Sequence, residues 1–259
     1  MSRSRDLVLP ALYWAFVIYL LIPIAVMVAM GFKDSNFIGF PIENWTLRWY
    51  AEAVRDQDMM TAFGYSVLIA VASTAGALVL GLLIGLFLGP TRFFGKAVLF
   101  ALMALPAVTP GIISAISLRL FIRAIDLEPG TAAIILGHTI HNVPFVTLMV
   151  LTRLNALKPS TIEAAKDLGA DEIVAFFRVT LPFLRPALFG ACIFALLVSF
   201  DDFLRSFFLG GYEPTLPVLI FARLRSGMSP EINAISTIVL LITAALGIYG
   251  ERFMRRQRA

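Results

Sequence analysis

The chain has 259 residues, of which 59% are hydrophobic and 15% charged, and its mean hydropathy is +0.86. Soluble domains carry about 25% charged residues, so this composition excludes an ordinary soluble protein. The net charge of +4 does not indicate nucleic-acid binding, because the basic residues flank apolar stretches instead of forming a basic domain. The one cysteine, Cys192, provides neither an intramolecular disulfide nor a cysteine-based metal site.

Six apolar stretches are each long enough to cross about 30 Å of hydrocarbon as a helix. They cover approximately residues 8–31, 62–89, 96–121, 131–152, 183–209 and 232–251. The first follows a basic N-terminus, as in a signal peptide, but its apolar run from Leu7 to Met30 is too long and lacks a small-residue cleavage site. We therefore expect an all-α membrane protein with six transmembrane helices in a single domain, residues 1–259.

Lysine and arginine are concentrated in alternate connections between these spans. Those before the first span, after the second, after the fourth and after the sixth make up 13 of the 21 in the chain. Because basic residues are enriched in cytoplasmic connections, both termini and residues 158–182 are predicted to lie in the cytoplasm. The loop at residues 32–61 then lies outside. Its amphipathic stretch NWTLRWYAEAVRD has Trp45, Trp49 and Tyr50, which suit the membrane interface or an external partner.

The connection after the fourth span is charged and amphipathic, unlike the apolar stretches on both sides. Pro159 disfavours continuation of the span, and Ser160 with Glu163 has the spacing of a capping box, so a short helix is predicted to begin there. Gly169 is suited to end it in a left-handed conformation, and a second helix is predicted to begin near Asp171. On physical grounds alone, this helix-turn-helix fits a connector on the membrane surface as well as a docking site for another protein.

The same connection carries a spaced pattern from Glu163 to Pro182: E-A-A, three residues, G, nine residues, then V-x-L-P. It resembles the EAA motif of the membrane-spanning subunits of bacterial ABC importers, with valine where isoleucine is commoner. The resemblance implies a type I ABC importer (MetI-like) permease fold, with a cytoplasmic EAA coupling helix that docks on an ATP-binding subunit. The residues that it assigns to ATPase coupling are Glu163, Ala164, Ala165, Gly169, Leu181 and Pro182.

Three further pieces are similar to the spermidine/putrescine branch of these permeases: GHTIHNVPFVTLMVLTRL, VSFDDFLRSFFLGG and LPVLIFARLRSGMSPEINAISTIVLL. The resemblance implies half of a translocation path for a small organic solute. A polyamine is expected, while amino-acid-like solutes, opines and other small amines stay open.

The resemblance also implies the setting in which the chain works. It implies the bacterial inner membrane, a second and homologous permease subunit, two ATP-binding subunits that carry ATP and Mg²⁺, and a periplasmic or lipid-anchored solute-binding protein. The chain has no GxxxxGK[ST] loop, so neither a cofactor of its own nor ATPase activity is expected.

Two adjacent carboxylates, Asp201 and Asp202, lie near the outer end of the fifth predicted span, roughly 28 Å from Pro182 along a helix. A carboxylate at membrane depth is costly and usually faces a cavity or a partner. Arg205 is spaced to pair with either one, but a single arginine cannot neutralise both. The two form a candidate cation site on the substrate path, with Phe203 beside them for contact with a cation or an alkyl chain; a purely structural role is the alternative.

Two histidines, His138 and His141, share a face of the fourth predicted span. No carboxylate or thiol lies near them in sequence, so no metal site is predicted and a structural or path-lining role is expected. A membrane enzyme would need them to meet Asp201 and Asp202, which hydropathy places on another span. A secondary transporter or channel would show inverted repeats, and we detect none in the sequence.

Overall fold

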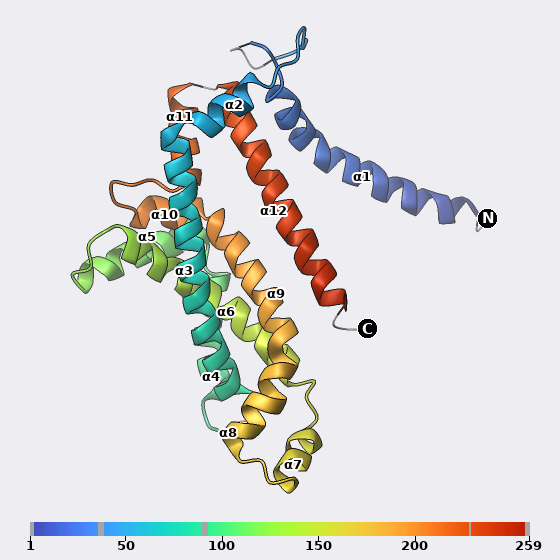
Figure 1. The fold of residues 1–259 in the computed structure, drawn as a ribbon, viewed down its shortest axis with the longest axis vertical. Coiled ribbons are helices and arrows are strands. Elements are labelled where there is room, and N and C mark those ends of the chain that lie inside the picture. Colours follow the sequence, from blue (N-terminus) through green and yellow to red (C-terminus); the bar gives the residue numbers. More distant parts are fainter. Residues whose placement is uncertain (1–2, 36–38, 90–92, 228, 257–259) are drawn as a thin grey trace. The chain divides into compact units, whose positions relative to one another are not determined.

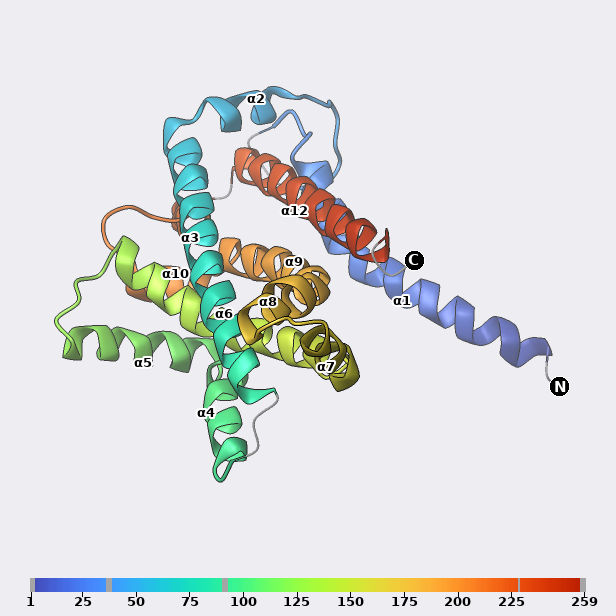
Figure 2. The same ribbon diagram turned by 60° about the horizontal axis from the view of Figure 1, so that its bottom comes forward.

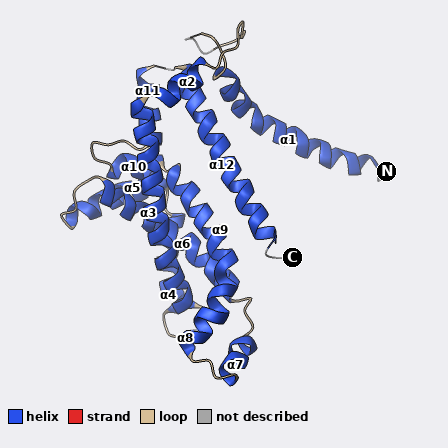
Figure 3. Cartoon of the chain, in the orientation of Figure 1, coloured by secondary structure: helices blue, strands red, loops and turns tan. Residues whose placement is uncertain are grey.

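The computed structural model describes residues 3–35, 39–89, 93–227 and 229–256. These residues are nearly all helical (Figure 3), and the one extended pairing among them is an isolated bridge between Lys33 and Trp45. The all-α prediction is confirmed. The chain divides into two compact units, one made of residues 1–61 and 220–242 and the other of residues 62–219 and 243–259.

The first unit contains α1 (Arg3–Met30), α2 (Arg48–Arg55) and the adjoining parts of α11 (Leu216–Ser226) and α12 (Pro230–Arg256). The side chain of Trp49 on α2 is buried, and its indole Nε1 donates to the backbone carbonyl of Lys33 at 2.7 Å. Tyr50 packs on Phe32 with ring centroids 4.7 Å apart. The expectation of Trp49 at the membrane interface is therefore wrong, because its ring is packed inside the protein, whereas Trp45 is exposed.

A cluster of charged side chains joins the start of α3 (Gln57–Leu88) to α11 and α12. Arg223 donates to both carboxylate oxygens of Asp56, at 2.6 and 3.1 Å, and its guanidinium lies 3.6 Å from Asp58 and 3.8 Å from Glu231. The hydrogen bond from Arg223 holds the pKa of Asp56 below its usual range. Asp56 is therefore ionised at neutral pH, and the pair fixes the corner between α2 and α3 in this unit.

The second unit is built around α6 (Thr131–Leu154) and α9 (Leu181–Phe200), which run antiparallel. His138 near the start of α6 contacts Ser199 near the end of α9, and Arg153 at the end of α6 contacts Phe183 at the start of α9. Figures 1 and 2 show α7 (Pro159–Asp167) and α8 (Glu172–Ala175) at one end of this pair, and α10 (Phe203–Leu209) at the other.

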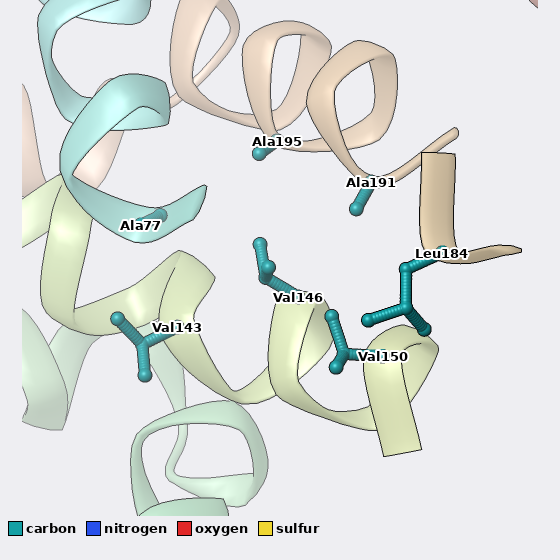
Figure 4. Close-up of a cluster of buried hydrophobic side chains, with 7 residues drawn as sticks. All are labelled: Ala77, Val143, Val146, Val150, Leu184, Ala191 and Ala195. Atoms are coloured by element: carbon teal, nitrogen blue, oxygen red, sulfur yellow. The ribbon is translucent and has the colours of Figure 1, made fainter. Parts of the chain in front are cut away.

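A core of small and branched side chains joins α3, α6 and α9 (Figure 4). Its buried members are Ala77, Val143, Val146, Val150, Leu184, Ala191 and Ala195. Glycines on α3 allow the close approach, because a Cβ at Gly81 or Gly85 would lie 2.6 Å from the side chain of Val146 or Val150. This core fixes α6 and α9 as a pair on the side that α3 covers.

Five helices among the described residues are long and apolar enough to cross a membrane, and the count rises to six if α4 (Lys96–Val108) and α5 (Gly111–Ala124) together form one bent span. The predicted continuous helix over residues 96–121 is wrong, because α4 and α5 meet at 108°. Pro110 disfavours a helical conformation at the residue before it, and Thr109 is extended with ψ 132°. The apolar run hides this break, since hydropathy does not register backbone conformation.

Candidate functional site

The segment with the EAA pattern forms a helix, a tight turn and a second helix; residues 158–177 are called the tip segment below. Lys158 is extended and Pro159 occupies the first turn of α7, where its missing N–H costs nothing and its φ suits the helix. The predicted capping box is wrong: Ser160 lies within α7, and no side chain caps the helix N-terminus. Proline, and not the Ser160–Glu163 spacing, sets the helix start.

The turn of the tip segment agrees with the prediction. Gly169 has φ +89°, a conformation that side chains with a Cβ rarely adopt. The N–H of Ala170 donates to the carbonyl of Ala165 at 3.0 Å, a bond that closes the end of a helix around a left-handed residue. Asp171 then starts the next helix, because its carboxylate accepts from the N–H of Val174 at 2.7 Å.

Apolar side chains of the tip segment are left uncovered. Leu168 is 90% exposed, and Ile173 and Phe177 are also exposed, as are Glu163 and Ala164 of the EAA pattern. Burial of such side chains is normally favourable, so a group of them on a charged segment indicates an interaction surface. The small side chain of Ala164 allows the backbone of another protein to approach this surface closely.

One continuous helix leads from the tip segment to the two aspartates. It runs from Glu172 to Phe200 through α8, a short π-helical segment (Phe176–Thr180) and α9. The π-type bond from the N–H of Leu181 to the carbonyl of Phe176 lies just before Pro182, which has no N–H to donate and so disturbs the regular ladder. The predicted span start at residue 183 is therefore too late. Leu181 and Pro182 lie inside the helix and not in a separate lead-in.

The continuous helix ends at Phe200, and a new short helix, α10, begins at Phe203. Asp202 caps α10: one of its carboxylate oxygens accepts from the N–H of Arg205 at 3.0 Å, and the other accepts from the guanidinium at 2.6 Å. Both side chains are buried, at 7% and 6% exposed. The predicted continuous helix over residues 183–209 is wrong, because the Asp202 carboxylate satisfies the backbone of a helix that starts afresh.

The two histidines of α6 meet this ion pair. A guanidinium nitrogen of Arg205 donates to Nδ1 of His141 at 2.8 Å, and Nε2 of His138 lies 4.0 Å from the carboxylate of Asp202. The histidines and Asp202 lie on different helices, as the sequence predicts, but they meet across those helices, which hydropathy does not show. Arginine can only donate, so Nδ1 of His141 accepts and the ring is a neutral partner of the ion pair.

A row of buried hydroxyls extends the same network and was not found from sequence. His138 contacts Ser199 at 2.7 Å and Ser206 at 3.3 Å, and Ser199 contacts Ser73 of α3 at 2.8 Å. The only hint in the sequence is that these serines lie in apolar stretches, and such serines are too common to predict which residues they contact. Among the described residues, no group of three or more histidine, cysteine or carboxylate side chains is placed to hold a metal ion.

Asp201 differs from Asp202 in its exposure to solvent and in its ion pairing. Its side chain is exposed, and it forms no ion pair with the residues that the structure describes. Arg205 neutralises Asp202 and leaves Asp201 as a carboxylate at the end of α9. Phe203 follows on α10, where its ring lies 5.4 Å from that of Phe207. The junction between α9 and α10 thus carries one carboxylate without an ion-pair partner among the described residues, followed in the chain by a pair of phenyl rings.

Residues 77–258 match the family described as "Binding-protein-dependent transport system inner membrane component". The chain belongs to this family. The putrescine transport system permease protein PotI of Escherichia coli K12 is 34% identical over 251 residues, which cover 92% of this chain and 88% of that protein. The spermidine/putrescine transport system permease protein PotC of the same strain is 31% identical over 239 residues, covering 92% and 90%. PotC of Haemophilus influenzae is 29% identical and covers 98% of both chains.

Solved structures of transporters have the same fold. A chain of the bacterial alginate ABC transporter, in complex with an alginate pentasaccharide-bound periplasmic protein, aligns with a TM-score of 0.73 at 16% identity, covering 98% of this chain and 96% of that one. A chain of the MetNI methionine ABC transporter, in an inward-facing conformation, aligns with a TM-score of 0.62 at 21% identity, covering 74% and 92%. The predicted type I importer permease fold is confirmed.

Membership of the binding-protein-dependent transport family fixes the broad class of the protein. The chain is a multi-pass membrane permease of an ABC importer, which is the membrane component of such a system and not its ATPase. The resemblance to the spermidine/putrescine permeases is likewise confirmed by relatives that align over most of the chain.

Replacing Asp202 should lower the stability of the protein, whereas replacing Asp201 should leave it nearly unchanged. Asp202→Asn leaves the buried Arg205 guanidinium without its counter-charge, so it should cost about 3–5 kcal/mol and lower the thermal unfolding midpoint in detergent. Asp201→Asn is the matched control and should change stability by no more than about 0.5 kcal/mol. Equal losses in the two variants would show that the ion pair is not what distinguishes these aspartates.

Proposed function

We propose that this permease is one of two subunits that form the pore of an ATP-driven bacterial importer for polyamines, and that it couples to the ATPase through the tip segment. The observation that carries the coupling is the exposed helix-turn-helix, in which Glu163 and Ala164 stand beside uncovered Leu168, Ile173 and Phe177. A surface of this composition is suited to a groove on another protein. The spaced EAA pattern supports the choice of the ATP-binding subunit as that protein.

The proposed complex has a second, homologous permease subunit, two ATP-binding subunits and a solute-binding protein, periplasmic or lipid-anchored. ATP and Mg²⁺ belong to the ATP-binding subunits. The distribution of basic residues supports placing both termini and the tip segment in the cytoplasm, with the complex in the bacterial inner membrane. In this orientation the ends of α6 and α9 that carry the tip face the ATPase, and the end with Asp201 lies in the outer half of the membrane.

The continuous helix supports a direct route for coupling. Its 29 residues from Glu172 to Phe200 correspond to about 43 Å, from the tip segment to the residue before Asp201. Arg153 braces the start of α9, since its Nε donates to the carbonyl of Phe183 at 3.0 Å and its guanidinium stacks on the Phe183 ring at 4.0 Å. When ATP binding draws the ATP-binding subunits together, displacement of the tip moves α6 and α9 as one body. The groove on the ATP-binding subunit binds the tip segment more tightly in one conformation of the permease than in the other, and this difference in binding favours that conformation.

Asp201 is proposed as the residue that contacts a cationic solute on the path. Its charge is not neutralised by Arg205, which pairs with Asp202, and Phe203 follows two residues later in the chain as a candidate aromatic contact. The relatives PotI and PotC are named as permeases of putrescine and of spermidine with putrescine. An amine with an alkyl chain fits this combination of one carboxylate with phenyl rings.

Reversal of charge on the tip should uncouple the permease. Glu163→Arg places a cation in the proposed ATPase contact and should abolish copurification of the ATP-binding subunits and solute-stimulated ATP hydrolysis, while the permease still inserts in the membrane. Glu43→Arg, an equal charge change at an exposed position of the other unit, should have no effect. Normal assembly and uptake in the Glu163 variant would refute the coupling role.

Neutralisation of Asp201 should weaken handling of cations specifically. In reconstituted complexes tested across polyamines, amino acids and other small organic solutes, the wild type should be most active with polyamines. Asp201→Asn should lower uptake of putrescine at least tenfold, because the ammonium group loses its counter-charge, without loss of the ATP-binding subunits. Unchanged putrescine uptake would remove Asp201 from the path, and a preference for an uncharged solute would contradict the polyamine assignment.

A further inference from the structure

A cavity of about 680 Å³ lies in the second unit, on the opposite side of the α6–α9 pair from the core that α3 covers. Its walls are mainly apolar and come from the second half of α6, from α9 and from the last part of α12. The lining residues that matter below are Leu148, Thr152, Arg153, Phe194, Gly247 and Glu251. Typical sites for small organic ligands measure about 300–1,000 Å³, so the cavity has a suitable size.

Two glycines of α12 shape this cavity. At Gly250 a Cβ would lie 2.5 Å from Ile193 of α9, so α12 touches α9 there. At Gly247, one turn earlier, a Cβ would meet nothing within 4 Å, although the residue lines the cavity. The cavity therefore lies next to the close contact between α12 and α9 at Gly250, and Gly247 on its border has no side chain that would fill it.

Aromatic side chains connect the cavity to the break between α9 and α10. His141, which binds Arg205, lies 5.6 Å from the ring of Phe145, and Phe145 lies 5.2 Å from Phe194 in the cavity wall. The far end of the cavity reaches Arg153, at the end of α6 that leads to the tip segment. The cavity thus extends along α6 and α9 from the region of the aspartates toward the tip.

We propose that this cavity is a second substrate site, an inner chamber that holds the solute after it leaves Asp201 and before it is released on the ATPase side. It would take an aliphatic chain with ammonium groups. Leu148 and the other apolar walls accommodate methylene groups, and the Phe194 ring in the wall offers aromatic surface to a cation. Glu251 also lines the cavity. The Arg153 charge is directed onto the Phe183 ring and carbonyl. The inference rests on the proposed importer function, which sets the direction of travel.

The chemistry of the lining favours a solute over a lipid chain. Both Arg153 and Glu251 line the cavity, so its wall combines one charge of each sign with apolar side chains. The ring of Phe145 separates Phe194 in the cavity wall from His141 of the buried polar network. A groove for lipid tails would need no such charges.

Gly247→Cys in a Cys192→Ala background gives a thiol that reports on the cavity in the reconstituted complex. A water-soluble quaternary-ammonium methanethiosulfonate should modify it, and saturating putrescine should slow the modification at least tenfold. Gly64→Cys is the matched control, because Gly64 is also a helical glycine whose Cβ would meet nothing within 4 Å, on α3. Whatever its rate, modification at position 64 should not respond to putrescine.

Each other outcome overturns the proposal in an identifiable way. Modification in the isolated subunit but not in the complex would place a partner helix in the cavity. Lipid would occupy the cavity if the charged reagent fails to modify the thiol and brominated acyl chains quench a fluorophore at position 247. If putrescine does not slow the modification, the cavity contains water but does not bind the solute. Uptake by the wild-type complex, measured in the same vesicles, separates these results from failure of the proposed importer function.

A blocking variant gives a second readout that does not depend on labelling. Gly247→Leu places a side chain in the cavity and should reduce putrescine uptake at least tenfold while the ATP-binding and partner subunits still copurify. Gly64→Leu should leave uptake unchanged. Wild-type uptake in the Gly247 variant, or loss of assembly together with uptake, would contradict an inner chamber at this position.

Discussion

The Asp202–Arg205 ion pair is the interaction on which the arrangement of the second unit depends. It is buried at the end of α9, and each carboxylate oxygen of Asp202 has a defined donor, one from the backbone of α10 and one from the guanidinium. His141 accepts a further guanidinium bond. A buried pair depends on how many of its donors and acceptors are satisfied. Asp202 and His141 take up the terminal guanidinium nitrogens of Arg205, while its Nε has no hydrogen-bond partner among the described residues. Because the pair ends one helix and starts another, it also leaves Asp201 at the junction as a separate, exposed carboxylate.

The sequence predicted some features that local chemistry determines, and it missed other local features together with those that long-range contacts determine. The turn at Gly169 and the helix start at Asp171 follow from a few adjacent residues, and both are present. The breaks at Thr109–Pro110 and at Asp201–Asp202 interrupt runs that hydropathy treats as uniform. The choice of Asp202 over Asp201 by Arg205 was not predictable either, since helical spacing allows both pairings. Burial of Trp49 depends on the Lys33 carbonyl, 16 positions away.

The two candidate sites lie at opposite ends of one helix. At one end the tip segment exposes apolar side chains for a partner, and at the other α9 stops beside Asp201. Between them, α9 packs against α6 through the core shared with α3, and the Arg153–Phe183 contact ties their ends together next to the tip. The opposite side of the same pair borders the cavity. A displacement of the tip therefore acts on the aspartate site and on the cavity walls together, which is the physical basis of the proposed coupling.

The central claim is that the helix from Glu172 to Phe200 moves as a rigid body between the tip and Asp201. Spin labels at Glu172→Cys, the exposed first residue of this helix, and at Val198→Cys in its last turn, in a Cys192→Ala background, would report the distance between its two ends within one chain. Pulsed electron-spin measurements on the assembled complex, with and without ATP, test it directly. The account predicts an unchanged distance within the chain while the Glu172 label moves relative to one on the partner permease. A change within the chain of about one helical turn, roughly 5 Å, or more would show that the helix bends and would contradict it.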